Sequence, residues 1–245
     1  MNFAHITDVG KVRDNNEDCY YVDENKGLFI VADGMGGHNA GEIASRYAIK
    51  FFCAHFYSLI DEDDNEDHIE SYIDRSVRFA NSKLYEISKD IKSLDGMGTT
   101  LTILYLFKGK AYIGNVGDSR VYFVNDVLNQ ITTDHSLVEE LLKKGEITEE
   151  EARNHPQRNI ITQAVGSDSG VEIQLISMPY EGEKVLLATD GLTNLVEDFE
   201  IYDLITSNSL EESCGKLVNL ANDRGGNDNI TVVIFEDFRF VGGNR

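Results

Sequence analysis

The sequence predicts an α+β fold, because its predicted strands and helices form separate blocks and do not alternate as β-α-β units. Short apolar runs typical of buried strands come first. Two long stretches with helical periodicity follow, then closely spaced strands, and finally helices and one last strand. The 245 residues are 41% hydrophobic, which is enough for one large core or at most two small ones. No linker rich in Pro or Ser separates the blocks, so we predict one domain spanning residues 1–245.

The first half of the chain combines predicted strands with two long predicted helices. Residues 28–32 form a short apolar run of the kind found in buried strands. Residues 39–59 and 69–87 carry apolar side chains at helical spacing, which predicts two consecutive helices. Several short strands follow between residues 99 and 131, and turn residues between them predict an antiparallel sheet. These hairpin signals are Lys108-Gly109-Lys110 and Asn125-Asp126.

The second half begins with a charged segment, residues 134–170, that has few large apolar residues and is typical of a mobile surface region. Within it we predict a helix over 137–144, ended by Gly145, and a second helix start at Thr148-x-x-Glu151.

A strand over 185–189 comes next. The capping box Ser209-x-x-Glu212 then begins a helix that Gly225-Gly226 ends, just before the last strand, 230–235.

Four aspartates lie where predicted strands begin or end. They are Asp33 after the run 28–32, Asp118 after 111–116, Asp190 after 185–189 and Asp228 just before 230–235. A carboxylate in such a place is costly to bury unless positive charge meets it, so we interpret the four as one cation site.

Glycine follows two of these aspartates, at Gly34 and Gly191, where a missing Cβ would let the chain turn sharply and let a carbonyl approach a cation. A single Asp-Gly pair on its own would indicate a hairpin turn. However, Gly34 begins the run Gly34-Met35-Gly36-Gly37, which has too many glycines for a tight hairpin.

The ligand types favour Mg²⁺ or Mn²⁺ over zinc, because Asp oxygens occur without a matching set of His or Cys. The chain has no H-E-x-x-H or C-x-x-C motif, and its three cysteines, Cys19, Cys53 and Cys214, are far apart. The acidic run 61–67 resembles a calcium loop, but Glu66 stands where that loop needs Gly and Tyr72 where it needs Glu. We interpret 61–67 as a solvated loop between helices.

Charge and targeting signals restrict the partners. With 43 acidic and 22 basic residues, the formal charge is −21 at pH 7, which argues against nucleic acid and anionic membranes. The sequence shows neither a signal peptide nor an apolar stretch of membrane-spanning length, and its cysteines fit a reducing compartment. We therefore expect a cytoplasmic protein.

Seven motifs, in order along residues 13–233, closely resemble those of the metal-dependent (type 2C) Ser/Thr protein phosphatases. They are Arg13-Asp14-Asn15-Asn16-Glu17-Asp18, 31–37, Gly98-Thr99-Thr100, 114–120, 133–138, 188–192 and 228–232. The form Met35-Gly36-Gly37 after Asp33-Gly34 is similar to the bacterial branch. The resemblance implies a four-layer α-β-β-α sandwich of two antiparallel sheets flanked by helices, in which residues 134–170 form a flap beside the active site.

The resemblance also implies a role for each motif residue, with two Mn²⁺ or Mg²⁺ ions as cofactors. Asp33 would bridge the two metals, Asp190 and Asp228 would complete the ligands of one, and the Gly34 carbonyl would bind the other. Asp18, with Glu17 as a further candidate, would hold metal-bound waters. Asp118 with Asp190 would form a weaker third site, and Arg13 would bind the substrate phosphate. A guanidinium matches phosphate oxygens in bidentate geometry. The alternative for Arg13 is a surface salt bridge to Asp14 or Asp18.

The function implied by the resemblance is hydrolysis of phosphoserine and phosphothreonine by a water activated at the binuclear metal centre. Bound cations and Arg13 would make the cleft locally positive in this acidic chain. The expected partners are phosphoproteins, namely a bacterial Ser/Thr kinase and its targets, and we expect a monomer. Animal members carry His where this chain has Met35, and we interpret His38 and His135 as structural residues.

Two other functions stay open from the sequence. One is a non-catalytic relative that binds phosphoproteins, although such proteins usually lose a metal ligand and Asp33, Asp190 and Asp228 are all present here. The other is a two-metal enzyme that acts on a nucleotide or sugar phosphate, although no cluster of aromatic residues for base stacking lies beside the motifs.

Overall fold

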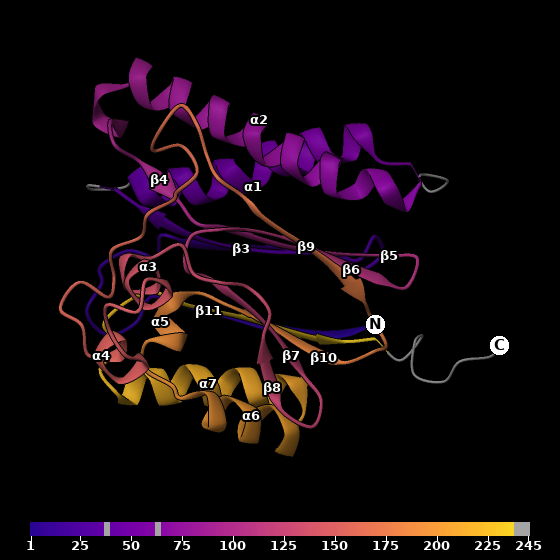
Figure 1. Ribbon diagram of the computed structural model, residues 1–245, viewed down its shortest axis with the longest axis vertical. Helices are drawn as coiled ribbons and strands as arrows, with labels where there is room; N and C mark the ends of the chain where they lie inside the picture. Colours follow the sequence, from indigo (N-terminus) through magenta and orange to yellow (C-terminus); the bar gives the residue numbers. More distant parts are fainter. Residues whose placement is uncertain (37–39, 62–64, 238–245) are drawn as a thin grey trace.

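A computed structural model of the chain describes residues 1–36, 40–61 and 65–237. Two antiparallel sheets lie face to face, and helices cover the outer face of each sheet (Figure 1). This arrangement confirms the predicted α+β fold, a four-layer α-β-β-α sandwich.

The first sheet has the strand order β1-β11-β10-β7-β8, and every neighbouring pair is antiparallel. Its strands are β1 (Asn2–Asp8), β7 (Arg120–Val124), β8 (Leu128–Gln130), β10 (Lys184–Ala188) and β11 (Ile230–Glu236). The central strands β10 and β11 are almost completely buried, in keeping with their apolar sequences.

The second sheet has the order β2-β3-β5-β6-β9, and a short strand, β4, also pairs with β3. Its strands are β2 (Asp18–Asp23), β3 (Leu28–Met35), β4 (Gly98–Thr99), β5 (Leu101–Phe107), β6 (Lys110–Val116) and β9 (Gln174–Pro179). Strand β3 continues two residues past Asp33, so Asp33 lies inside the strand and not at its end.

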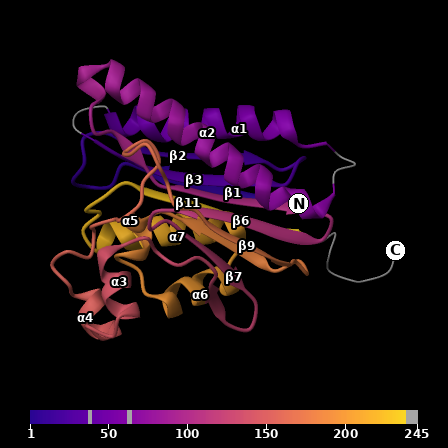
Figure 2. The same ribbon diagram turned by 45° about the horizontal axis from the view of Figure 1, so that its top comes forward.

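Helices α1 and α2 cover the second sheet, while α5, α6 and α7 lie against the first. Helices α3 and α4 lie at the same end of the sandwich as α5 (Figures 1 and 2). The helices are α1 (Ala40–Leu59), α2 (Ile69–Asp90), α3 (Leu137–Lys143), α4 (Glu149–Arg153), α5 (Asp190–Thr193), α6 (Asp198–Ser207) and α7 (Leu210–Asp223), with the 3₁₀ turns η1 (Glu66–His68) and η2 (Lys92–Leu94). Among the described residues, no helix is both long enough and apolar enough to span a membrane.

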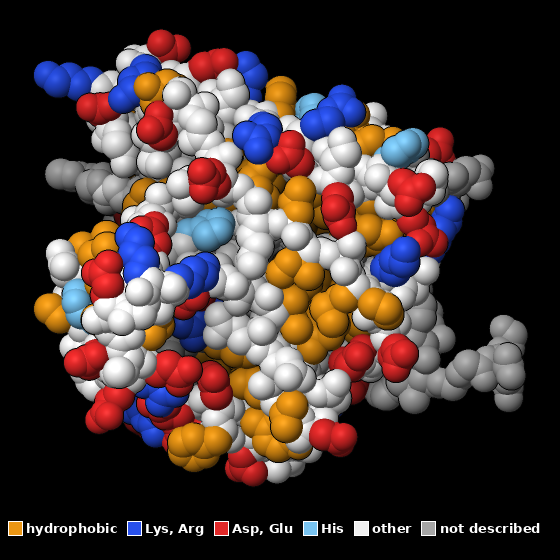
Figure 3. All heavy atoms as spheres, in the orientation of Figure 1, with side chains coloured by type: hydrophobic (Ala, Val, Ile, Leu, Met, Phe, Trp, Pro, Cys, Tyr) orange, Lys and Arg blue, Asp and Glu red, His pale blue; other side chains and the backbone are white. Residues whose placement is uncertain are grey.

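Three apolar layers hold the sandwich together. One lies between the sheets, where the rings of Phe29 and Phe235 stack with their centroids 3.8 Å apart. The others lie between each sheet and its helices, around Phe52 and Phe56 on one side and Tyr122 on the other. Acidic side chains, interspersed with Lys and Arg, are spread over the face shown in Figure 3.

Most predicted elements are present, with local corrections. Both predicted capping boxes form, at Thr148 and Ser209. The acidic run 61–67 is not simply a loop, because Glu66–His68 forms η1 with Asn65 capping its N-terminus; residues 62–64 lie outside the described part of the chain. Strands β1, β2 and β9 and helix α6 are the main elements that the sequence patterns did not identify.

Candidate active site

A cleft of about 230 Å³ opens at one end of the two sheets. The described residues that line it are Arg13, Glu17, Asp33, Gly34, Met35, Gly36, Thr100, Asp118, Asn159, Ile161, Asp190 and Asp228. Six of the seven predicted site residues are therefore in one place, although they are up to 215 positions apart in the chain. The seventh, Asp18, does not line the cleft but pairs with Asp33 across β2 and β3.

Backbone and hydroxyl contacts fix the position of Asp33. Its N–H donates to Thr100 Oγ1 over 2.8 Å, and its carbonyl accepts from Thr99 Oγ1 and from the Thr100 N–H, each also over 2.8 Å. Beside it, the buried Asp18 accepts from Thr189 Oγ1 over 2.8 Å, which ties the second sheet to the first. The Gly98-Thr99-Thr100 motif thus holds Asp33 in place through hydrogen bonds.

Gly34 and Gly191 are required by close packing rather than by sharp turns. A Cβ at Gly34 would lie 2.1 Å from the Gly41 carbonyl oxygen, and one at Gly191 would lie 1.9 Å from the Asn229 carbonyl oxygen. Gly34 belongs to β3 and Gly191 to α5. The expectation of sharp turns is therefore wrong at both positions, because each glycine permits a second backbone segment to pass against it.

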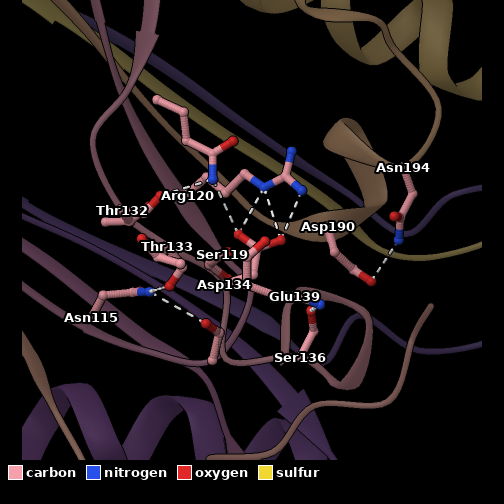
Figure 4. Close-up of polar contacts among 12 residues, drawn as sticks. Asn115, Ser119, Arg120, Thr132, Thr133, Asp134, Ser136, Glu139, Asp190 and Asn194 are labelled. Carbon is pink, nitrogen blue, oxygen red and sulfur yellow. Dashed lines mark hydrogen bonds and ion pairs between the residues drawn. The ribbon is translucent and has the colours of Figure 1, made fainter. Parts of the chain in front are cut away.

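Asp118 and Asp190 approach each other from neighbouring strands of the first sheet. Arg120 at the start of β7 pairs with Ala188 at the end of β10, and the two aspartates lie two residues beyond this pair. Asp118 is buried, and Asp190 accepts from Asn194 Nδ2 over 2.9 Å. Figure 4 shows Asp190 with Asn194 and, beside them, the side chain of Arg120.

Arg13 meets Asp228 at the mouth of the cleft. Its Nη2 donates to Asp228 Oδ2 over 2.8 Å, so its ion pair is not with Asp14 or Asp18, which were the alternatives expected from the sequence. The Arg13 side chain is half exposed, and its partner is one of the predicted metal ligands.

Asn229 holds the N-terminal segment against this end of β11. Its Nδ2 donates to the carbonyls of Val9 and Asn15, each over 2.9 Å, and its Oδ1 accepts from the Glu17 N–H over 2.8 Å. Asn229 was part of a motif in the sequence, but its role in positioning Arg13 and Glu17 was not predicted.

Burial and mutual repulsion raise the pKa values of the acidic side chains. Burial is the largest cause for Asp33, Asp118 and Asp190, and the charges of neighbouring aspartates add to it. Burial also raises the pKa of Asp18 to about 7, against hydrogen bonds from two threonines that lower it. Such a concentration of carboxylates requires positive charge to stay ionised at neutral pH.

The side chains fit a hard divalent cation by their chemistry. Asp18 Oδ1 and Asp190 Oδ1 are buried oxygens without a hydrogen-bond partner in the described part of the chain, and carboxylate oxygens are the ligands that Mg²⁺ and Mn²⁺ prefer. Within residues 1–36, 40–61 and 65–237, no three His, Cys, Asp or Glu side chains already surround one point as a metal cage. Arg13, Thr189 and Asn194 instead occupy one oxygen each of Asp228, Asp18 and Asp190.

Two histidines near the motifs were interpreted as structural. His135 exchanges two hydrogen bonds with Gly117: its N–H donates to the Gly117 carbonyl over 2.9 Å, and its Nδ1 accepts from the Gly117 N–H over 3.3 Å. Burial lowers the pKa of His135, which keeps Nδ1 an acceptor. His38 lies outside the described residues.

Comparison with known proteins identifies close relatives. The protein phosphatase 2C family model matches residues 9–232. The serine/threonine phosphatase stp of Listeria innocua serovar 6a is 40% identical over 242 residues, 96% of each chain. The serine/threonine phosphatase PstP/Ppp of Mycobacterium tuberculosis superposes with a TM-score of 0.88 at 38% identity, over 95% of this chain and 97% of the other. The catalytic domain of PstP in complex with 2 manganese ions gives a TM-score of 0.83 at 36% identity, over 95% and 96% of the two chains.

The two-sheet sandwich, the acidic cleft and these likenesses define the class as metal-dependent protein-serine/threonine phosphatases. The chain belongs to the protein phosphatase 2C family. The predictions of this activity, of phosphoprotein substrates and of Mn²⁺ or Mg²⁺ as cofactor are thereby confirmed.

Proposed function

We propose that the acidic cleft is the catalytic centre and that its residues have the roles implied by the family motifs. The observation that carries this proposal is that Arg13, Asp33, Asp118, Asp190 and Asp228 line one cleft. In this assignment Asp33, the Gly34 carbonyl, Asp190 and Asp228 would hold two metal ions. Asp118 and Asp190 provide a third, weaker position.

The chain's own residues bind and orient the substrate. Arg13 projects a half-exposed guanidinium at the mouth of the cleft, where it can exchange Asp228 for two phosphate oxygens. Asp18, held by Thr189, orients water beside Asp33. When bound, the metal ions lower the pKa of a water molecule to give the nucleophile and neutralise the charge of the phosphoryl group. Asn159 and Ile161, from the segment 134–170, form the wall that faces the substrate.

The finer biological setting belongs to the same proposal. The substrates are a bacterial Ser/Thr kinase and its targets, and the enzyme works as a monomer in the cytoplasm. Three free cysteines in the described residues support a reducing compartment. The chain forms one catalytic domain over residues 1–245, and residues 134–170 act as its flap.

Phosphate release from a phosphothreonine peptide by metal-stripped protein, titrated with Mn²⁺ and with Mg²⁺, tests the proposal. We expect release that depends on metal and is abolished in Asp33→Asn, because this variant would remove a ligand charge from the proposed metal centre. Asp203→Asn, which alters an exposed aspartate on α6, is the matched control and should retain full activity.

Two outcomes would contradict the proposal. Near-normal turnover by Asp33→Asn would exclude the assigned metal centre. No release by folded protein at any metal concentration would favour a phosphoprotein-binding role instead. A parallel assay with free nucleotides compares the two classes of phosphate ester, and we expect the peptide to be the better substrate.

A further inference from the structure

A second arginine, Arg120, lies just behind the cleft and forms an ion pair with Asp134. Its Nε donates to Asp134 Oδ1 over 2.9 Å and its Nη2 to Oδ2 over 2.7 Å (Figure 4). Its Nη1 donates to the Tyr122 hydroxyl over 3.0 Å. The Arg120 side chain is 25% exposed and that of Asp134 only 13%. All three guanidinium nitrogens therefore have a hydrogen-bond partner that does not line the cleft.

Arg120 is nevertheless close enough to two cleft carboxylates to pair with them. It follows Asp118 by two positions, and its strand partner Ala188 precedes Asp190 by two. Asp118 lies in the bend just before β7, and Asp190 is the first residue of α5, just after β10, so both carboxylates lie beside this strand pair. Figure 4 shows Asp190 next to the Arg120 side chain. Burial raises the pKa of Asp118 and of Asp190, and the positive charge of Arg120 lowers both.

Asp134 is fixed in place from both sides along the chain. Before it, the Thr133 N–H donates to Gln174 Oε1 over 2.9 Å. After it, His135 and Gly117 are joined by two hydrogen bonds. The Asp134 carboxylate therefore stands on a rigid support next to the loop that carries Asp118, and it can hold Arg120 in one orientation.

Arg13 shows what a guanidinium at this cleft does when no other carboxylate holds it. Arg13 forms an ion pair with Asp228, a predicted metal ligand, at 2.8 Å. An arginine that pairs with a ligand carboxylate competes with a divalent cation for the same oxygens. Arg13 is half exposed and can swing out towards a phosphate, whereas Arg120 is largely buried.

We propose that Asp134 is a positioning residue for cation binding: by holding Arg120, it keeps that guanidinium from pairing with Asp118 and Asp190, whose carboxylates stay available to a divalent cation. This inference rests on the proposed metal centre. It gives the Arg120–Asp134 pair a role in metal affinity, beyond its contribution to the stability of the fold.

Calorimetric titration of metal-stripped protein with Mn²⁺, without substrate, tests this role in four proteins. We expect Asp134→Asn to weaken the weakest Mn²⁺ step by about tenfold or more, the effect typical of residues that support metal ligands. Arg120→Gln should bind at least as tightly as the wild type, because only the competing cation is removed. The double variant Arg120→Gln with Asp134→Asn should return close to the wild-type affinity.

A purely structural role gives the opposite pattern. Arg120→Gln and Asp134→Asn would then weaken binding alike, and the double variant would recover nothing, which would overturn the inference. If Asp134→Asn does not fold, Arg120→Gln alone decides, because weaker Mn²⁺ binding in it contradicts the proposal. Wild-type protein that binds no Mn²⁺ would overturn the proposed metal centre and this inference together.

Glu200→Gln is the matched control. Glu200 accepts from Arg224 Nη1 and Nη2 over 2.6 and 2.7 Å, an equally complete Arg–carboxylate pair between α6 and α7, and neither residue lines the cleft. Its removal costs the protein a similar ion pair without changing the charges around Asp118. We expect unchanged Mn²⁺ affinity, so a loss in this variant would assign the Asp134 effect to stability alone.

Discussion

The ion pair between Arg13 and Asp228 joins the segment before β2 to the start of β11. In the proposed mechanism Arg13 binds the substrate phosphate and Asp228 binds metal. We predict that Arg13→Ala raises KM for a phosphothreonine peptide with a smaller change in kcat, because the guanidinium binds the phosphate in both the ground state and the transition state. Arg13→Lys should recover only part of the loss, since an ammonium cannot bind two oxygens side by side. Steady-state kinetics with saturating Mn²⁺ measures both constants.

Lys11→Ala provides the control for Arg13. Lys11 lies two residues earlier on the same segment, and its ammonium reaches Asp223 at 3.6 Å, with both side chains exposed. It carries the same charge but does not line the cleft. Its replacement should leave KM unchanged, and a loss of kcat alone in Arg13→Ala would show that the phosphate-binding role is wrongly assigned.

Alanine substitutions at two glycines test whether packing requires the absence of a Cβ. Gly191→Ala would place a Cβ 1.9 Å from the Asn229 carbonyl oxygen, so the backbone must move. We expect a loss of about 1–3 kcal/mol in the free energy of unfolding, as for other overpacked sites. Gly215→Ala is the control, because it lies within α7 with open space around it. It should stabilise the protein by about 0.5–1 kcal/mol in urea titrations. Equal stability of the two variants would contradict the packing argument.

At the residue scale, the sequence identified the ligands but not the residues that hold them. Asp33, Asp190 and Asp228 stand out because each interrupts or adjoins an apolar run. Asn229 acts through Glu17, 212 positions away, and Asp134 acts through Arg120, 14 positions away. Nothing in local composition records such pairings, so only the folded chain reveals them.

At the scale of elements, the strands that escaped prediction lie at or near the sheet edges. β1, β2 and β9 are edge strands whose residues are mostly half-buried or exposed, so their sequences lack the continuous apolar runs of β5 or β11. The central strands were predicted because burial on both faces makes them apolar throughout. Helices α4 and α7 were predicted because their capping boxes begin with Thr148 and Ser209, a short local signature, whereas the capping box of α6 begins with Glu197 and was missed.

Helices α3 and α4 are bound to the rest of the protein mainly at the ends of their segment. No residue of α3 is buried, and α4 buries only Ala152. The segment's base is firmly held: the Thr162 N–H donates to the His135 carbonyl over 2.7 Å, and Val165 and Thr99 exchange hydrogen bonds of 2.8 and 3.0 Å. The middle of the segment should therefore open more readily than its base.

Hydrogen–deuterium exchange measures this difference. We predict that amides of α3 and α4 exchange much faster than those of Thr162 and Val165, because opening the helices exposes little apolar surface. Helix α7, which buries six residues, serves as the slow reference within the same experiment. Protection of α3 and α4 equal to that of α7 would show that this segment is a rigid part of the domain, contrary to its proposed role as a flap.

For the whole molecule, the formal charge of −21 and the buried carboxylates both destabilise the folded state. Repulsion among the surface charges is screened by any salt. Repulsion among the carboxylates inside the cleft is relieved only by a cation bound at Asp33 and its neighbours. We predict that Mn²⁺ at about 100 times its Kd stabilises metal-stripped protein by about 2.7 kcal/mol, since it binds only the folded chain. Thermal unfolding with and without Mn²⁺ measures the shift.

Melting temperatures measured in NaCl and in Mn²⁺, for the wild type and for Asp33→Asn, distinguish surface repulsion from repulsion in the cleft. NaCl at the ionic strength of the Mn²⁺ sample should raise the melting temperature of wild type and Asp33→Asn alike, because it acts on the surface charge that both share. The further rise with Mn²⁺ should occur only in the wild type. Asp33→Asn should be the more stable protein without metal, because one member of a buried repulsive cluster is neutral. A Mn²⁺ effect no larger than that of NaCl, or equal in both proteins, would place the stabilisation at the surface instead of the cleft.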